Sequence, residues 1–175
     1  MSGPRTVVVD ASVAIAIARA ESEGPPAAAR IVDWARGGAR IVVPSHFWLE
    51  VSNSLLRRHG WSGAAALEAV HELDRLRLET VDGDRALVLL AIDLCERHRL
   101  TTYDATYLAL ALTLDASIAT FDRALATAAG PRAIHPGASR LAGTPAPYEH
   151  PVTWPSYRGA SAYLAKLRAE AVRPG

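Results

Sequence analysis

Residues 6–10, TVVVD, carry the strongest indication of fold, because three valines follow a threonine and an aspartate closes the run. A short, uninterrupted run of β-branched residues is typical of a strand buried on both faces, as in parallel sheets covered by helices. Open parallel sheets bind their ligands beyond the carboxyl ends of their strands. Asp10 stands at such an end, although an acid at that point is equally typical of a residue that begins a helix.

The rest of the chain alternates strand-like and helix-like segments. We expect further strands at residues 40–43, 78–81, 116–119 and 132–135. We expect helices over residues 11–20, 27–38, 46–60, 63–76, 85–99, 103–114 and 121–130. Ser45, Ser62 and Asp84 are the expected N-caps of three of these helices. Strands that alternate with helices predict an α/β fold whose mainly parallel sheet of four to five strands is covered on both faces.

Length and charge limit the class of protein further. A chain of 175 residues is long enough for one domain with a sizeable core, and its net charge of +1 neither requires nor excludes a nucleic-acid partner. The single cysteine, Cys95, cannot form an internal disulfide, which favours a reducing compartment. No apolar run approaches the roughly 20 residues that span a bilayer. We therefore expect a cytoplasmic protein that does not interact with membranes.

Composition changes after about Gly130, and residues 136–156 contain five prolines. We expect a globular domain over residues 1–135 and a proline-rich extension over residues 136–175. The extension ends in a predicted amphipathic helix that docks on the domain or on a partner. Its apolar face would comprise Ala160, Tyr163, Leu164, Leu167 and Ala171.

Three more acids share the situation of Asp10. Asp122 follows the strand expected at 116–119, Asp104 lies near a helix start, and Glu50 lies within a helix three residues before Asn53. Each alone also fits an ordinary solvated or capping acid. Together, four carboxylates at converging strand ends would repel one another unless a cation lay between them. Oxygen ligands of this kind suit Mg²⁺ or Mn²⁺.

Other site types are absent from the sequence. One cysteine and six scattered histidines do not provide zinc-ligand spacing. There is no GxGxxG, GxxxxGK[ST] or GxSxG motif, which removes the common dinucleotide, P-loop and hydrolase interpretations. A phosphatase with an aspartate nucleophile fits poorly, because Ser12 occupies the position of the second aspartate that such sites need.

Four segments in order, VVVDASV, WLEVSNSLL, LTTYDATYLALA and SIATFDRAL, resemble the PIN domain over about residues 5–135. Within that family the chain is most similar to the VapC-type ribonuclease toxins of toxin–antitoxin pairs. The resemblance implies a three-layer α/β/α sandwich and an endoribonuclease that depends on Mg²⁺ or Mn²⁺. It implies catalytic and metal-binding roles for Asp10, Glu50, Asp104 and Asp122, with Ser12, Asn53 and Thr120 in support.

Partners follow from the same resemblance. We expect an RNA substrate, a cognate antitoxin and a homodimer. Arg123, Arg57 and Arg58 are the first candidates for phosphate contacts, with Arg97 and Arg99 behind them. Asp93 is a further acid that either faces the site or points to solvent. Two alternatives stay open: a housekeeping RNA-processing nuclease of the same fold, and a non-catalytic PIN-like module that binds RNA or protein.

Overall fold

The computed structural model describes residues 5–137 and shows a five-stranded sheet enclosed by helices. The strands are β1 (Thr6–Val9), β2 (Arg40–Pro44), β3 (Glu79–Val81), β4 (Ser117–Ala119) and β5 (Ala133–Ile134). The helices are α1 (Ala11–Ala18), α2 (Gly24–Arg36), α3 (His46–Asn53), α4 (Gly63–Asp74), α5 (Arg85–His98), α6 (Thr102–Thr113) and α7 (Arg123–Ala129). Two short turns complete the set, the π-helical η1 (Ser54–Arg58) and the 3₁₀ η2 (Gly130–Arg132).

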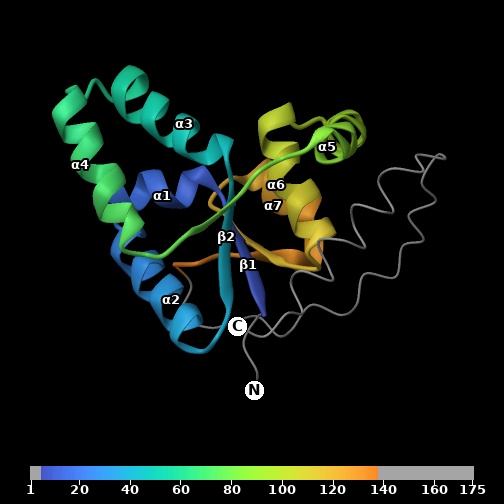
Figure 1. Ribbon diagram of the computed structural model, residues 1–175, viewed down its shortest axis with the longest axis horizontal. Coiled ribbons are helices and arrows are strands. Elements are labelled where there is room, and N and C mark those ends of the chain that lie inside the picture. The colour runs from blue at the N-terminus through green and yellow to red at the C-terminus, as the bar shows by residue number, and fades with distance from the viewer. Residues whose placement is uncertain (1–4, 138–175) are drawn as a thin grey trace.

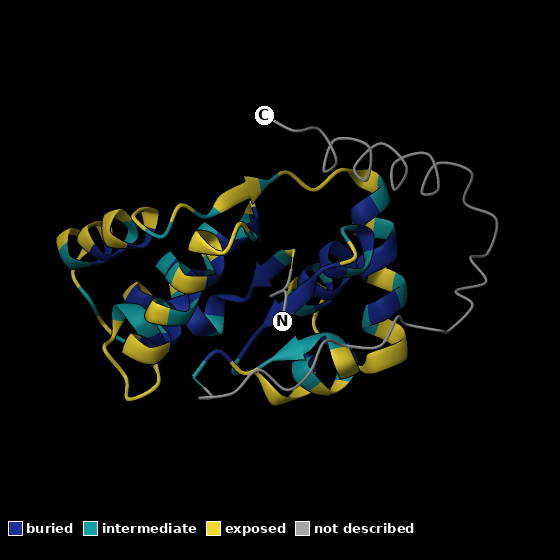
Figure 2. Cartoon of the chain, turned by 90° about the horizontal axis from the view of Figure 1, so that it is seen from below, coloured by how far each residue is buried: buried dark blue, intermediate teal, exposed yellow. Residues whose placement is uncertain are grey.

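The elements form three layers, as the sequence predicts. Figure 1 shows α1, α2, α3 and α4 on one side of the sheet and α5, α6 and α7 on the other. The valines of β1 are at most 1% exposed, so the central strand is buried on both faces. β3 and β5 lie at the edges of the sheet, where β3 is largely exposed and β5 is half-buried, while β1, β2 and β4 are mostly buried (Figure 2). The α/β sandwich fold is confirmed.

Strand order determines where a site can form. All neighbouring strands are parallel, and their order is β3-β2-β1-β4-β5. The chain adds β2 and β3 on one side of β1 and then crosses to add β4 and β5 on the other. Such a reversal opens a crevice at the carboxyl ends of the two central strands, where open α/β sheets bind ligands. Here these ends are Asp10, after β1, and Thr120, after β4.

The helix predicted over residues 46–60 forms, but its last part is π-helical and it ends at Arg58. α3 ends at Asn53, and the chain continues as η1, a wider turn that closes near Gly60 in a left-handed conformation (φ 67°). π-helical turns often occur at functional sites. The prediction that Ser45 caps this helix is wrong, because its backbone is already helical and its side chain accepts no capping hydrogen bond.

Other helix starts follow the sequence more closely. Ser62 accepts the N–H of Ala65, and Asp84 accepts the N–H of Leu87, so both predicted caps are confirmed. α2 begins at Gly24, earlier than expected, and includes Pro25 and Pro26 in its first turn. Proline is tolerated there because the N–H groups of a first helical turn have no partner within the helix.

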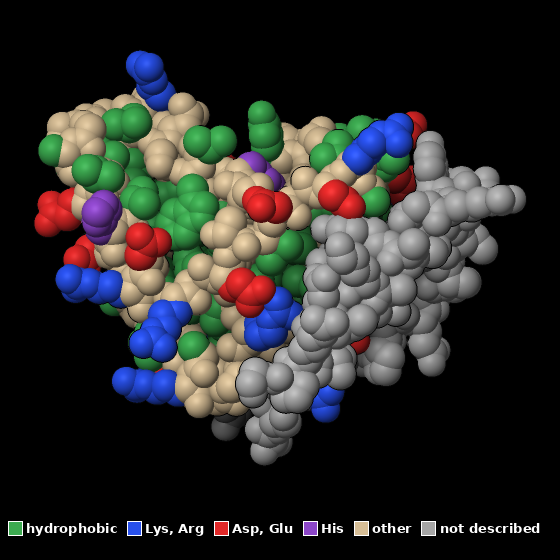
Figure 3. Space-filling view, in the orientation of Figure 1, with side chains coloured by type: hydrophobic (Ala, Val, Ile, Leu, Met, Phe, Trp, Pro, Cys, Tyr) green, Lys and Arg blue, Asp and Glu red, His purple; other side chains and the backbone are tan. Residues whose placement is uncertain are grey.

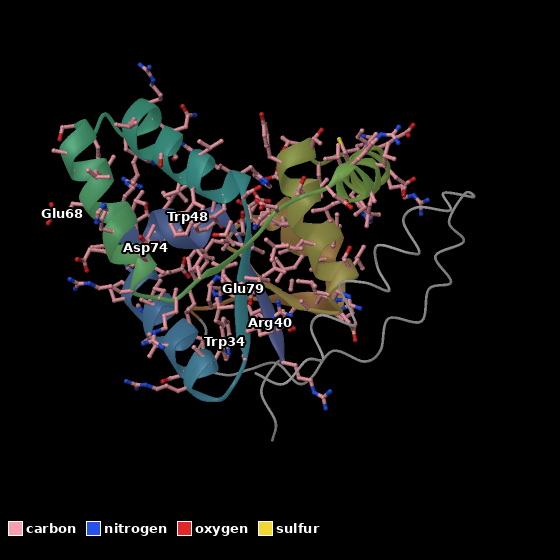
Figure 4. All side chains as sticks on the ribbon, viewed as in Figure 1. Trp34, Arg40, Trp48, Glu68, Asp74 and Glu79 are labelled. Carbon is pink, nitrogen blue, oxygen red and sulfur yellow. The ribbon has the colours of Figure 1, made fainter. Side chains whose placement is uncertain are left out.

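The helix that carries Glu50 is tied to the edge of the sheet. Trp48, two residues earlier on α3, donates its indole N–H to Thr80 of β3 at 2.9 Å. Arg40 and Glu79, which face each other in Figure 4, pair across β2 and β3 and hold the edge strand in register. Within residues 5–137, no helix has the length and apolarity to cross a bilayer. The predicted C-terminal helix lies outside the described residues.

Candidate active site

A cleft of about 350 Å³ lies at the carboxyl ends of the central strands. All four acids singled out in the sequence line it, although they come from segments up to 112 residues apart (Asp10 to Asp122). Its lining residues are Asp10, Ser12, Ile15, Glu50, Asn53, Ser54, Arg57, Arg58, Asp104 and Asp122. The cleft therefore combines carboxylates with two arginines of η1.

Asp10 lies deepest in the cleft and is only 3% exposed. Its Oδ2 accepts hydrogen bonds from Ser12 Oγ at 2.5 Å and from Thr120 Oγ1 at 2.7 Å. Burial raises the pKa of Asp10 above its usual range, the two hydroxyls oppose that rise, and the charge of Asp104 adds to it. The structure thus holds Asp10 firmly while leaving its negative charge poorly compensated.

Ser12 and Thr120 also fix the segment that carries Asp122. Ser12 Oγ accepts the N–H of Phe121 at 3.0 Å, and Thr120 Oγ1 accepts the N–H of Asp122 at 2.9 Å. Each hydroxyl therefore donates to Asp10 and accepts from the backbone after β4. Thr120 is 2% exposed and lies beneath the cleft, so it positions other groups instead of facing a ligand.

Glu50 reaches the cleft from α3 and is half-buried. Its Oε2 accepts the hydroxyl of Tyr107 on α6 at 2.9 Å. Burial raises the pKa of Glu50 to about 7; the Tyr107 hydrogen bond opposes the rise, and the charges of Asp10 and Asp104 strengthen it. The carboxylate is therefore held at the site in an environment that disfavours its charge.

Asp104 and Asp122 enter the cleft from helix starts. Thr101, not Asp104, is the N-cap of α6, and its hydroxyl donates to Asp104 Oδ2 at 2.6 Å. Asp122 is the N-cap of α7, and its Oδ1 accepts the N–H of Leu125 at 2.8 Å. Local helix chemistry therefore orients both carboxylates.

The four acids share one arrangement of their oxygens. Each carboxylate has one oxygen engaged by a protein hydroxyl or N–H: Asp10 Oδ2, Glu50 Oε2, Asp104 Oδ2 and Asp122 Oδ1. Among the described residues, no hydrogen bond reaches the second oxygen of any of them. Carboxylates that a hydrogen bond orients through one oxygen, with the other oxygen available, suit a divalent cation.

The acids line one cleft without forming a compact cage. Within residues 5–137, no three His, Cys, Asp or Glu side chains stand close enough together to hold an ion by themselves. The four carboxylates therefore share one cleft, as expected, but they do not surround a single point within it. A hard cation such as Mg²⁺ usually keeps several waters and takes one or two protein carboxylates, so the donor set still fits it.

Other predicted residues divide between the cleft and its surroundings. Asn53, Arg57 and Arg58 line the cleft, whereas Arg123 is exposed at the start of α7 and is not part of the lining. Asp93 also lies outside it and forms an ion pair with Arg97 one helical turn away. The solvent-facing interpretation of Asp93 is therefore the better one.

Two residues of the site escaped the sequence analysis. Tyr107 is fully buried, and its hydroxyl donates a hydrogen bond to Glu50. The ring of His46 packs on Tyr103 and Tyr107, and its Nε2 lies 4.0 Å from Glu50 Oε2. Helical spacing could have identified both residues, because residues three or four apart share a face of a helix. His46 precedes Glu50 by four residues, and Tyr107 follows Asp104 by three.

With this geometry in place, comparison with known proteins identifies the family. The PIN domain family matches residues 7–131, and the chain belongs to it. PIN domains are generally nucleases, which supports a hydrolase that acts on RNA. No curated protein matches the chain.

Solved structures agree with the family assignment. VapC20 from Mycobacterium tuberculosis, titled a sarcin–ricin loop cleaving toxin, has 22% identity and a TM-score of 0.56, covering 70% of this chain and 94% of that one. A toxin–antitoxin complex from Klebsiella pneumoniae has 15% identity and a TM-score of 0.54, over 74% and 97%. PAE2754 from Pyrobaculum aerophilum has 21% identity and a TM-score of 0.53, over 70% and 78%. These similarities show a common fold.

Proposed function

We propose that this protein is an endoribonuclease that hydrolyses RNA phosphodiester bonds with Mg²⁺ or Mn²⁺. The observation that carries the proposal is the set of four carboxylates in one cleft, each with one oxygen fixed and the other available. The raised pKa values of Asp10 and Glu50 support it: burial first and neighbouring carboxylates second disfavour their charged forms, and a bound cation would favour those forms.

The residues of the cleft would have different roles in phosphodiester hydrolysis. Asp10, Glu50 and Asp104 would hold the cation, with Asp122 completing the set; when bound, it would offset charge on the phosphoryl oxygens and lower the pKa of a bound water. Ser12 and Thr120 keep Asp10 in place. Arg57 and Arg58, on the wall formed by η1, are placed to bind the RNA backbone.

The test is cleavage of a mixed RNA pool by purified protein with Mg²⁺ or Mn²⁺. We expect cleavage by the wild type, and its loss with Asp10→Asn and with EDTA. Asp93→Asn is the matched control, since it removes an acid outside the cleft and should cleave normally. Cleavage that survives Asp10→Asn, or folded wild-type protein that cleaves nothing in either metal, would refute the proposal.

We further propose that the nuclease is the toxin of a toxin–antitoxin pair. Two structures of the same fold support this, one titled a sarcin–ricin loop cleaving toxin and one a toxin–antitoxin complex. Induced expression should then arrest growth, and Asp10→Asn should abolish the arrest. Normal growth despite active enzyme would favour a housekeeping nuclease instead, and inactive protein that still binds RNA would favour a binding module.

A homodimer is the expected assembly, and exposed apolar side chains support it. Leu49 of α3, Val88 and Ile92 of α5 and Tyr103 of α6 are between 45% and 73% exposed. Figure 3 shows hydrophobic side chains along the edge of the molecule where α3, α5 and α6 lie. Sedimentation should give a dimer for the wild type and a monomer for Ile92→Glu. A wild-type monomer would contradict this assembly.

A further inference from the structure

We propose that Tyr107 is a positioning residue of the active site, whose hydroxyl holds the Glu50 carboxylate in place for cation binding. The inference rests on the proposed function, because it concerns how the chain prepares a metal ligand. It begins from one contact, the 2.9 Å hydrogen bond from the Tyr107 hydroxyl to Glu50 Oε2.

Tyr107 is placed as a fixed support. Its side chain is fully buried in α6, the helix that packs directly on β1, β2 and β4. A tyrosine hydroxyl is protonated at neutral pH, and here it acts as the donor to the Glu50 carboxylate. A buried donor needs a partner, and Glu50 supplies it.

No other described group performs this task for Glu50. The nearest candidate, His46 Nε2, lies 4.0 Å from Glu50 Oε2, which is too far for a hydrogen bond. The His46 ring instead packs edge-on against the Tyr107 ring, with centroids 5.1 Å apart. Among residues 5–137, Tyr107 is therefore the single hydrogen-bond donor to this carboxylate.

The same hydrogen bond joins two helices that supply acids to the cleft. Glu50 lies on α3, and Tyr107 lies on α6, which also carries Asp104. Tyr107 therefore fixes the position of Glu50 relative to the helix of a second acid.

Removing the hydroxyl should act on the metal more than on the fold. Groups that hydrogen-bond to a metal-ligating carboxylate typically change metal affinity or activity about 10–100-fold when lost. Tyr107→Phe preserves the buried ring and removes only the hydrogen bond to Glu50. We expect Mn²⁺ affinity, measured by calorimetry on the full-length protein, to fall at least about tenfold.

Thr113→Val is the matched control, because it removes another buried hydroxyl from α6, six residues beyond Tyr107. It should bind Mn²⁺ as the wild type does. A double-mutant cycle gives the sharper readout, since Tyr107→Phe should have little further effect on Mn²⁺ affinity once Glu50→Gln is present. Unchanged affinity in Tyr107→Phe, or an equal loss in both backgrounds, would overturn the inference.

The proposed function and this inference fail in different ways. Folded wild-type protein that binds no Mn²⁺ would overturn both, whereas wild type and Tyr107→Phe that bind equally would overturn the positioning role alone. If Tyr107→Phe does not fold, the wild type supplies a second readout by NMR of labelled tyrosines. Mg²⁺ should shift the Tyr107 signals, and unchanged signals under saturation would overturn the inference.

Discussion

Asp10 and Thr120 meet at the ends of the two central strands, where the Thr120 hydroxyl donates to Asp10 Oδ2 at 2.7 Å. Asp10 follows β1 and Thr120 follows β4, so this hydrogen bond joins the two strands between which the strand order reverses. The same hydroxyl accepts the N–H of Asp122 at 2.9 Å. One buried hydroxyl therefore helps to position two of the four acids.

Replacing Thr120 by valine should weaken the site while keeping its shape. The substitution removes a hydrogen bond that lowers the pKa of Asp10, and it frees the N–H of Asp122. We expect kcat and Mn²⁺ affinity to fall about 10–100-fold. Thr120→Ser, which retains the hydroxyl, should preserve most of both, and equal losses in the two variants would show that the hydroxyl is not the cause.

Stability without metal should depend on pH through Glu50. Its pKa is about 7 in the folded protein against 4.5 ordinarily, so between these values the folded state holds a proton that the unfolded state has lost. The metal-free protein should therefore lose stability as pH rises through this window, with Asp10 contributing in the same sense. Allowing for solvent screening of a carboxylate that is one-third exposed, Glu50 contributes about 1–2 kcal/mol.

Urea unfolding in EDTA at pH 5 and pH 8 measures this effect. The wild type should be less stable at the higher pH, and Glu50→Gln should reduce the difference by about 1–2 kcal/mol. The variant should also be inactive, since the same charge serves the metal. If stability differs between pH 5 and pH 8 as much in Glu50→Gln as in the wild type, ionisation of Glu50 does not destabilise the folded protein.

Gly24 allows the close approach of α1 and α2. A Cβ at this position would lie 2.3 Å from the carbonyl oxygen of Ala16, and backbone on both sides leaves little room to move. We expect Gly24→Ala to lower the free energy of unfolding by about 1–3 kcal/mol. Gly63→Ala, where a Cβ meets nothing within 4 Å, is the control and should be neutral or slightly stabilising. If Gly24→Ala and Gly63→Ala have similar free energies of unfolding in urea, α1 and α2 do not depend on a glycine at position 24.

RNA binding should depend on the arginines of η1. A plot of log K against log salt concentration has a negative slope for single-strand binding, and each phosphate contact that is lost makes this slope less steep by about 0.7. We expect this change for Arg57→Ala and for Arg58→Ala, measured in the Asp10→Asn background to prevent cleavage. Arg75→Ala removes an arginine that pairs with Glu72 on α4, outside the cleft. If all three behave alike, η1 does not bind the RNA backbone.

Sequence pattern predicted the layers because each strand and most helix ends have local causes. The valines before Asp10 have a β-branched character that only a buried strand satisfies, and Ser62 and Asp84 cap helices within their own first turns. The wide turn η1 had no such local signal, because Ser54–Arg58 is as compatible with an ordinary helix.

The acids could be selected from the sequence because they follow strands or begin helices near one edge of the sheet. Their partners could not, because contacts such as Tyr107 with Glu50 join residues 57 apart and depend on how α6 packs against α3. A tyrosine in an apolar helix such as α6 is otherwise typical of a core residue. Arg123, beside Asp122 in sequence, lies outside the cleft because α7 begins there.

The central claim is that these four carboxylates form one cation site, and a crystal soaked in Mn²⁺ tests it most directly. Anomalous scattering should place manganese in the cleft, bound by oxygens of Asp10 and at least one of Glu50, Asp104 and Asp122. A parallel crystal of Asp10→Asn should show a much weaker peak. Manganese bound elsewhere, or a cleft that stays free of it at saturating concentration, would contradict the account.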